Sequence, residues 1–163
     1  MQTHLLLESI SKFVPDTFKV SVLYTYTDDK SKAAYQLVRS RFRNVAFQKE
    51  ENFIRDVVVK VQNSNRLTFF TDDDVFFSTP TASAKEIEET VDDPNILCYS
   101  LRLGLNVVQQ GYGGGLRQFL ATPIHKVRAG GAIIEWDWTK EWPLQDFGYG
   151  FSIDGHVHTK QSL

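Results

Sequence analysis

The first half of the chain alternates helix-like and strand-like segments, and this alternation limits the possible fold more than any other feature. Apolar residues follow helical spacing over three segments, residues 3–13, 28–42 and 50–65. Runs rich in β-branched and aromatic residues separate them, FKVSVLYTYT (18–27), NVAFQKE (44–50) and RLTFFT (66–71). The helix-like segments between successive strand-like runs are long enough for right-handed crossover connections. They predict an α/β fold with a mostly parallel central sheet flanked by helices.

The second half is less regular. AKEIEETV (84–91) has the pattern of a short acidic helix, and NILCYSLRLG (95–104), AIIEWDW (132–138) and DFGYGFSIDGHVHT (146–159) are strand-like. The GYGGG run (111–115) does not match a dinucleotide-binding fingerprint, so we interpret it as a flexible lid or acceptor loop, or as an inert loop. No repeat or linker separates a second domain, so one domain over residues 1–163 is expected.

Composition excludes several classes of protein. The net charge of −2 supplies no basic field, so no nucleic-acid partner is expected. No run approaches the roughly 20 apolar residues of a transmembrane segment, and the N-terminal sequence lacks the pattern of a secretory signal. Cys98 is the single cysteine, which excludes an internal disulfide and agrees with a reducing compartment. A cytoplasmic protein is therefore expected.

Three adjacent aspartates lie between two aromatic pairs in FFTDDDVFF, Phe69 to Phe77. If the preceding strand continues, Asp72 and Asp74 share one side and Asp73 points to the other. Two carboxylates on one side suit Mg²⁺ or Mn²⁺, ions that often complete their shell with substrate phosphates. A solvated turn or a helix cap is the alternative, because aspartate favours both.

A second polar group lies near the C-terminus, in SIDGHVH. If a strand persists through Gly155, Asp154, His156 and His158 share one face. Imidazole and carboxylate groups together ligate a divalent ion, and either group can act as a base. The alternative is a surface strand with incidental histidines.

The EWDWTKEW segment is rich in tryptophan. Strand alternation places Trp136 and Trp138 on one face, where their rings suit stacking on sugars or bases. A place in the core is the alternative for at least one of them. Cys98 lies in an apolar strand-like run, so we interpret it as structural.

Four blocks in this order, TFFTDDDVF, DDPNILCYSLRLGLN, IIEWDW and DFGYGFSIDGHVH, resemble small glycosyltransferases of the GT-A fold, close to the family 2 type. The resemblance runs from about Gln2 to Thr159, nearly the whole chain. It implies a GT-A-like domain that transfers a sugar from a nucleotide-diphosphate sugar to a glycan or other hydroxyl acceptor. It also implies dependence on Mn²⁺ or Mg²⁺ and inversion of the anomeric configuration.

The resemblance also implies roles for individual residues. Asp154 is the candidate general base for the acceptor hydroxyl. The candidate metal ligands are Asp72, Asp74 and His156, and the candidates for donor binding are Asp72, Asp73, Arg102, Trp136 and Trp138.

The sequence departs from this family pattern at both ends. Such enzymes normally begin with a strand and a loop that grip the nucleotide base, whereas Met1 begins at what resembles the helix after that loop. The chain also stops soon after IDGHVH, so a domain truncated at both ends is expected. Two other functions stay open: a metal-dependent phosphohydrolase using Asp72, Asp74, His156 and His158, and a non-catalytic nucleotide or sugar binder.

Overall fold

The computed structural model describes residues 2–104, 107, 124–128, 133–141, 146–148 and 154–163. Its contacts separate two compact units, Met1–Asn65 with Asp72–Thr79, and Arg66–Thr71 with Pro80–Leu163. The GYGGG loop lies outside the described residues. One domain over residues 1–163 stays a prediction.

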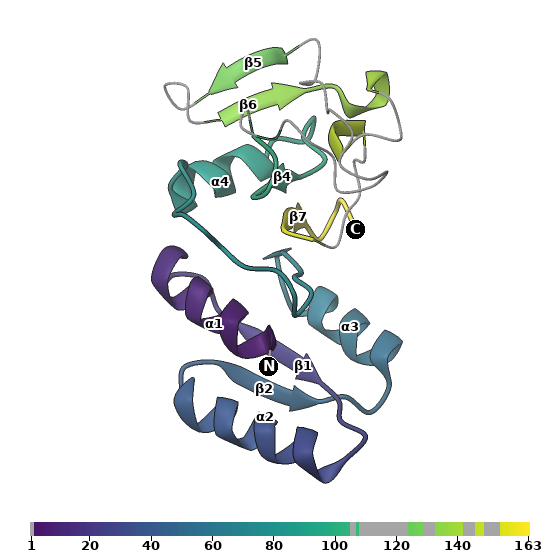
Figure 1. The fold of residues 1–163 in the computed structure, drawn as a ribbon. Coiled ribbons are helices and arrows are strands. Elements are labelled where there is room, and N and C mark those ends of the chain that lie inside the picture. The colour runs from purple at the N-terminus through teal and green to yellow at the C-terminus, as the bar shows by residue number, and fades with distance from the viewer. Residues whose placement is uncertain (1, 105–106, 108–123, 129–132, 142–145, 149–153) are drawn as a thin grey trace. The chain divides into compact units, whose positions relative to one another are not determined.

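The first unit contains the alternating pattern that the sequence predicts. Its elements, in chain order, are α1 (Gln2–Phe13), β1 (Ser21–Tyr24), α2 (Asp29–Arg41), β2 (Ala46–Lys49) and α3 (Phe53–Gln62). Strands β1 and β2 pair in parallel, with Ser21 opposite Ala46 and Tyr24 opposite Lys49. Helix α2 is therefore the crossover of a short β-α-β unit (Figure 1).

Apolar side chains of α1 and α2 form the core of the first unit. Leu7 of α1 packs with Val38 and Phe42, and the partly buried side chains around them include those of Val22 and Phe47 from the two strands. In Figure 1 both helices lie beside the strand pair. The sequence spaces Leu37, Val38 and Phe42 as one helical face; Val38 and Phe42 are in this core, whereas Leu37 is 71% exposed.

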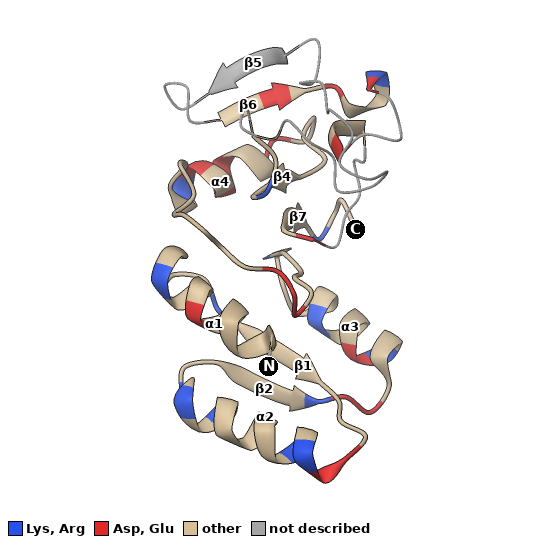
Figure 2. Cartoon of the chain, in the orientation of Figure 1, with Lys and Arg blue, Asp and Glu red and all other residues tan. Residues whose placement is uncertain are grey.

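Charged residues of both signs occur on each α-helix in the described part of the chain (Figure 2). Arg41 of α2 forms an ion pair with Glu8 of α1, which connects these two helices. Lys60 of α3 donates a hydrogen bond of 2.8 Å from Nζ to Ser21 Oγ of β1. Polar side chains thus link neighbouring elements at the surface of the first unit.

Helix α3 leaves its apolar residues largely exposed. The sequence places Phe53, Val57 and Val61 on one helical face; Val57 and Val61 are partly buried, but Phe53 is 60% exposed and its neighbour Ile54 is 75% exposed. Asp56 is the buried residue of this helix, and its Oδ2 accepts hydrogen bonds from the backbone N–H groups of residues 51 and 52. No α-helix in the described part of the chain is long and apolar enough to span a membrane.

The described residues of the second unit form one α-helix and several short strands. Its elements are β3 (Arg66–Leu67), α4 (Ala84–Val91), β4 (Tyr99–Ser100), β5 (Ile124–Arg128), β6 (Ile133–Trp136), the 3-10 helices η2 (Trp138–Lys140) and η3 (Asp146–Gly148), and β7 (His156–Thr159). Strand β7 lies between β3 and β4 and is antiparallel to both. Strands β5 and β6 form a separate antiparallel pair.

The mixed α/β class is confirmed, but a mostly parallel central sheet is not found among the described strands. One pair is parallel, β1 with β2, and the other pairings are antiparallel. The difference arises because β7, from the end of the chain, returns between β3 and β4. Segment patterns indicate which residues form strands, but not the direction in which distant strands pair. The GT-A fold stays a prediction.

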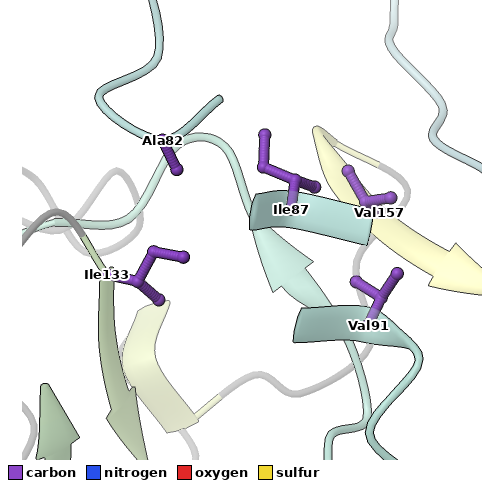
Figure 3. Close-up of a cluster of buried hydrophobic side chains, with 5 residues drawn as sticks. All are labelled: Ala82, Ile87, Val91, Ile133 and Val157. Carbon is purple, nitrogen blue, oxygen red and sulfur yellow. The ribbon is translucent and has the colours of Figure 1, made fainter. Parts of the chain in front are cut away.

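The core of the second unit lies between α4 and the strands. Ile87 and Val91 of α4 pack with Val157 of β7 and Ile133 of β6, as Figure 3 shows. Helix α4 begins with a capping box, in which Ser83 accepts from the Glu86 N–H and the Glu86 carboxylate accepts from the Ser83 N–H. This core fixes one face of β7 and directs the alternate side chains of that strand to its other face.

Candidate functional site

The acidic residues lie in a turn. Strand β3 ends at Leu67, and Asp72 and Asp73 form the turn. Strand alternation therefore does not apply to Asp72 and Asp74. Asp72 and Asp73 are exposed and Asp74 is partly buried. All three belong to the first unit, where the N–H of Phe76 donates a 3.0 Å hydrogen bond to the hydroxyl of Ser9 on α1.

A guanidinium and two carboxylates meet in the second unit. Arg102 Nη1 is 3.7 Å from Asp154 Oδ2, and Arg102 Nη2 is 3.4 Å from Asp146 Oδ1. The Asp154 side chain is 36% exposed and that of Asp146 is 17% exposed. The structure thus brings together two predicted site residues, Arg102 and Asp154, and adds Asp146. The positive charge of Arg102 attracts both carboxylates, one at each terminal nitrogen of its guanidinium group.

Gly155 separates Asp154 from the strand that follows. Its φ of +70° lies in the left-handed region, and β7 begins only at His156. The predicted common face of Asp154 and the two histidines is therefore wrong, because the strand does not extend through the glycine. The Gly155 N–H donates to the carbonyl of Phe69 at 2.8 Å, and its carbonyl accepts from the Leu101 N–H at 2.9 Å.

Replacing Gly155 by alanine is expected to destabilise the protein by about 1–3 kcal/mol, because a side chain at positive φ is strained. A Cβ at this position would also lie 3.1 Å from Cε1 of Phe70. Denaturant unfolding monitored by circular dichroism measures the loss. A variant as stable as the wild type would show that the turn accepts a side chain without strain.

The two histidines of β7 are buried. His156 is 3% exposed and His158 is 1% exposed, so the alternative of a surface strand with incidental histidines is wrong. Their ring centroids are 6.2 Å apart, and Cys98 Sγ lies 3.7 Å from His156 Nδ1. Burial, with smaller contributions from Arg102 and His158, lowers the pKa of His156 to about 4. Burial raises the pKa of the Cys98 thiol to about 11.

The two predicted tryptophans do not share a strand face. Strand β6 ends at Trp136, and Asp137 caps η2, which begins at Trp138. Trp136 donates from Nε1 to the carbonyl of Phe147 at 2.9 Å, and the two rings meet edge to face at 5.2 Å. Trp136 therefore contributes to packing. Trp138 is 41% exposed, which leaves its ring accessible for stacking.

Asp137 itself holds the start of η2. Its Oδ1 accepts from the Thr139 hydroxyl at 2.6 Å and from the Thr139 N–H at 3.1 Å, and Lys140 Nζ lies 3.0 Å from Oδ2. The hydrogen bonds with Thr139, followed by that with Lys140, lower the pKa of Asp137 to about 2. The carboxylate therefore serves the local turn that follows β6.

Two residues that the sequence did not identify as site residues lie beside candidate residues in the structure. Asp146 contacts Arg102, and Cys98, which we interpreted as structural, contacts His156. For Cys98, the sequence offered one signal, the strand-like run that contains it, and this run alone does not indicate a neighbour. Its partner becomes evident only when β4 is known to pair with β7. For Asp146 we find no comparable signal in the sequence.

Comparison with curated proteins gives a partial similarity. Ninety residues are 33% identical to the "Bifunctional glycosyltransferase pgtA" of Dictyostelium discoideum. The match covers 54% of this chain and 12% of that protein, so the chain corresponds to a small part of it. No protein-family model matches the chain. No solved structure matches it significantly.

Proposed function

We propose that the chain is part of a metal-dependent glycosyltransferase that moves a sugar from a nucleotide-diphosphate sugar to a hydroxyl acceptor. The observation that carries this proposal is the 33% identity over 90 residues to a bifunctional glycosyltransferase. The order of the four sequence blocks, from TFFTDDDVF to DFGYGFSIDGHVH, supports it independently of the fold. Inversion through a single displacement follows from the family resemblance.

The chemistry of the donor atoms fits a hard divalent cation at the acidic turn. Asp72 and Asp74 supply carboxylate oxygens, the atoms that Mg²⁺ and Mn²⁺ prefer, and Asp72 is exposed. When bound there, the cation would offset the negative charge of the departing diphosphate. His156 fits such an ion less well, since it is buried beside a cysteine sulfur. Its role as a Mn²⁺ ligand stays a prediction.

Two side chains of the second unit have proposed roles in transfer. Asp154 takes the proton of the acceptor hydroxyl as that oxygen attacks the anomeric carbon. Arg102 orients Asp154, and Asp146 holds the other side of the guanidinium. Trp138 offers an exposed ring face for a sugar. Asp73 and Trp136 stay candidates for donor binding, although the hydrogen bond and ring contact of Trp136 serve packing.

Replacing Asp74 by alanine is expected to lower Mn²⁺-dependent turnover of the donor by about 100- to 1,000-fold. The reason is that a cation at a departing phosphate contributes several kcal/mol to the transition state. Donor hydrolysis and transfer are measured with and without Mn²⁺. The matched control is Asp16→Ala, which removes an exposed acid of the first unit outside the motif and should retain full turnover. Equal turnover of Asp74→Ala and the wild type would contradict the metal assignment.

Two further measurements test the phosphohydrolase and the non-catalytic binder. Release of phosphate from simple esters, with no preference for nucleotide sugars, would indicate the phosphohydrolase. Binding of the donor in calorimetry, without turnover on a panel of acceptors, would indicate a non-catalytic binder. Either result would contradict the proposed function.

A further inference from the structure

A cysteine and two histidines gather on one side of the β4–β7 strand pair in the second unit. Tyr99 of β4 is paired with Val157 of β7, and Ser100 with His156. Continuing this antiparallel register by one pair sets Cys98 opposite His158. Because side chains alternate along a strand, His156 and His158 share the face of β7 opposite to Val157. Val157 is in the apolar core with Ile87 and Val91, as Figure 3 shows.

The three side chains are close enough to bind one ion. One ligand atom from each of Cys98, His156 and His158 lies within 4.8 Å of the other two. In a tetrahedral zinc site, bond lengths of about 2.3 Å to sulfur and about 2.0 Å to nitrogen place these two donors about 3.5 Å apart. Cys98 Sγ lies 3.7 Å from Nδ1 of His156, so the sulfur is beside this ring, whose other nitrogen, Nε2, is the one without a hydrogen-bond partner among the described residues. A weak hydrogen bond between thiol and imidazole would show a similar separation, and metal-binding spectra distinguish the two.

Burial gives a second, independent indication of a ligand. His156 is 97% buried, since 3% of its surface is exposed, and its Nε2 has no hydrogen-bond partner among the residues that the structure describes. Buried polar atoms are normally hydrogen-bonded, because losing water without a replacement costs about 1–3 kcal/mol. A buried imidazole that lies beside a sulfur and a second imidazole is in an environment typical of metal ligands.

The kind of donor atoms selects the ion. One sulfur and two imidazole nitrogens suit Zn²⁺ and related transition metals, whereas Mg²⁺ and Mn²⁺ prefer carboxylate oxygens. We propose that Cys98, His156 and His158 bind a zinc ion, with a fourth coordination position left for another ligand. The ion links the end of β4 to the central strand β7. The three proposed zinc ligands all belong to the second unit and include no residue of the acidic turn, and the proposal does not depend on the proposed sugar transfer.

Cobalt binding tests the site with a spectroscopic signature. The 163-residue chain is stripped of metal with a chelator and titrated with Co²⁺ under reducing conditions. The expected result is one Co²⁺ per chain, with the visible bands of a tetrahedral ion and a sulfur-to-cobalt charge-transfer band that Zn²⁺ removes by competition. Mn²⁺ should not compete. A folded chain that gives no such bands would overturn the proposal, as would bands without the sulfur contribution.

Substitutions identify the ligands. Cys98→Ser should remove the charge-transfer band, and His158→Gln should weaken Zn²⁺ binding by at least about tenfold. His4→Gln, a histidine of α1 in the first unit, is the matched control and should bind as the wild type does. Unchanged affinity and unchanged spectra in both ligand variants would overturn the proposal. If the variants do not fold, the spectra of the wild-type chain decide alone. Sugar transfer plays no part in this readout, so loss of the proposed function would leave the result unaffected.

Discussion

Replacing Asp154 by asparagine is expected to lower the rate of sugar transfer by about 10²- to 10⁴-fold, the usual contribution of a general base. Asparagine has nearly the same shape as aspartate but cannot take the proton of the acceptor hydroxyl. It would also remove one of the two carboxylates that lie near Arg102 among the described residues, the other being that of Asp146. Steady-state rates measured against acceptor concentration check the loss, which should appear in kcat more than in KM.

Asp146→Asn is the matched control for this prediction. It removes the other carboxylate beside Arg102, at 3.4 Å, but the proposed mechanism gives it no proton to transfer. We expect a loss of activity much smaller than that of Asp154→Asn. Equal losses in the two variants would mean that Asp154 acts by holding Arg102, and the assignment of the base would be wrong.

Replacing Ile87 by alanine is expected to lower the free energy of unfolding by about 2–5 kcal/mol. Ile87 is 2% exposed and packs in the cluster with Val91, Ile133 and Val157, which fixes one face of β7 (Figure 3). Removing its side-chain carbons loses apolar burial and leaves a cavity between α4 and the strands. Denaturant unfolding followed by circular dichroism measures the effect.

The matched control for Ile87→Ala is Ile54→Ala. Ile54 lies on α3 and is 75% exposed, so the same substitution there should change stability by less than about 0.5 kcal/mol. Similar losses at the two positions would contradict the burial described for them. Loss of the packing against β7 in Ile87→Ala would displace His156 and His158. This variant should therefore also bind Zn²⁺ more weakly if the proposed site exists.

The regular first half of the fold was predictable from local pattern. The helical spacing over residues 28–42 identifies α2, and Asp28 caps it by accepting from the Ser31 N–H at 2.6 Å. The strand-like runs on either side correspond to β1 and β2, and the helix between them explains why this pair is parallel. The mixed α/β class follows from these local signals.

The antiparallel sheet of the second unit was not predictable in the same way. Leu67 pairs with His158, residues far apart in the sequence, and no local signal specifies that contact. The predicted alternation of Asp72 with Asp74 fails because β3 ends at Leu67 and a turn follows. The predicted face of Asp154 with the histidines fails because Gly155 adopts positive φ.

Individual candidates were predictable where chemistry is local, but their neighbours were not. Arg102 and Asp154 were both candidates, and the structure places them 3.7 Å apart. Asp146 and Cys98 were not candidates, because their importance comes from the residues that folding brings beside them. The burial of His156 and His158 likewise depends on β7 being the central strand of its sheet.

Mass spectrometry of an acceptor panel tests the proposed glycosyltransferase activity most directly. The chain is incubated with Mn²⁺, a set of nucleotide-diphosphate sugars and hydroxyl acceptors. We expect at least one acceptor to gain the mass of one sugar residue, with release of an equal amount of nucleoside diphosphate. If no acceptor gains a sugar under conditions in which the chain is folded and binds a donor, the chain is not a glycosyltransferase by itself and the proposed function is contradicted.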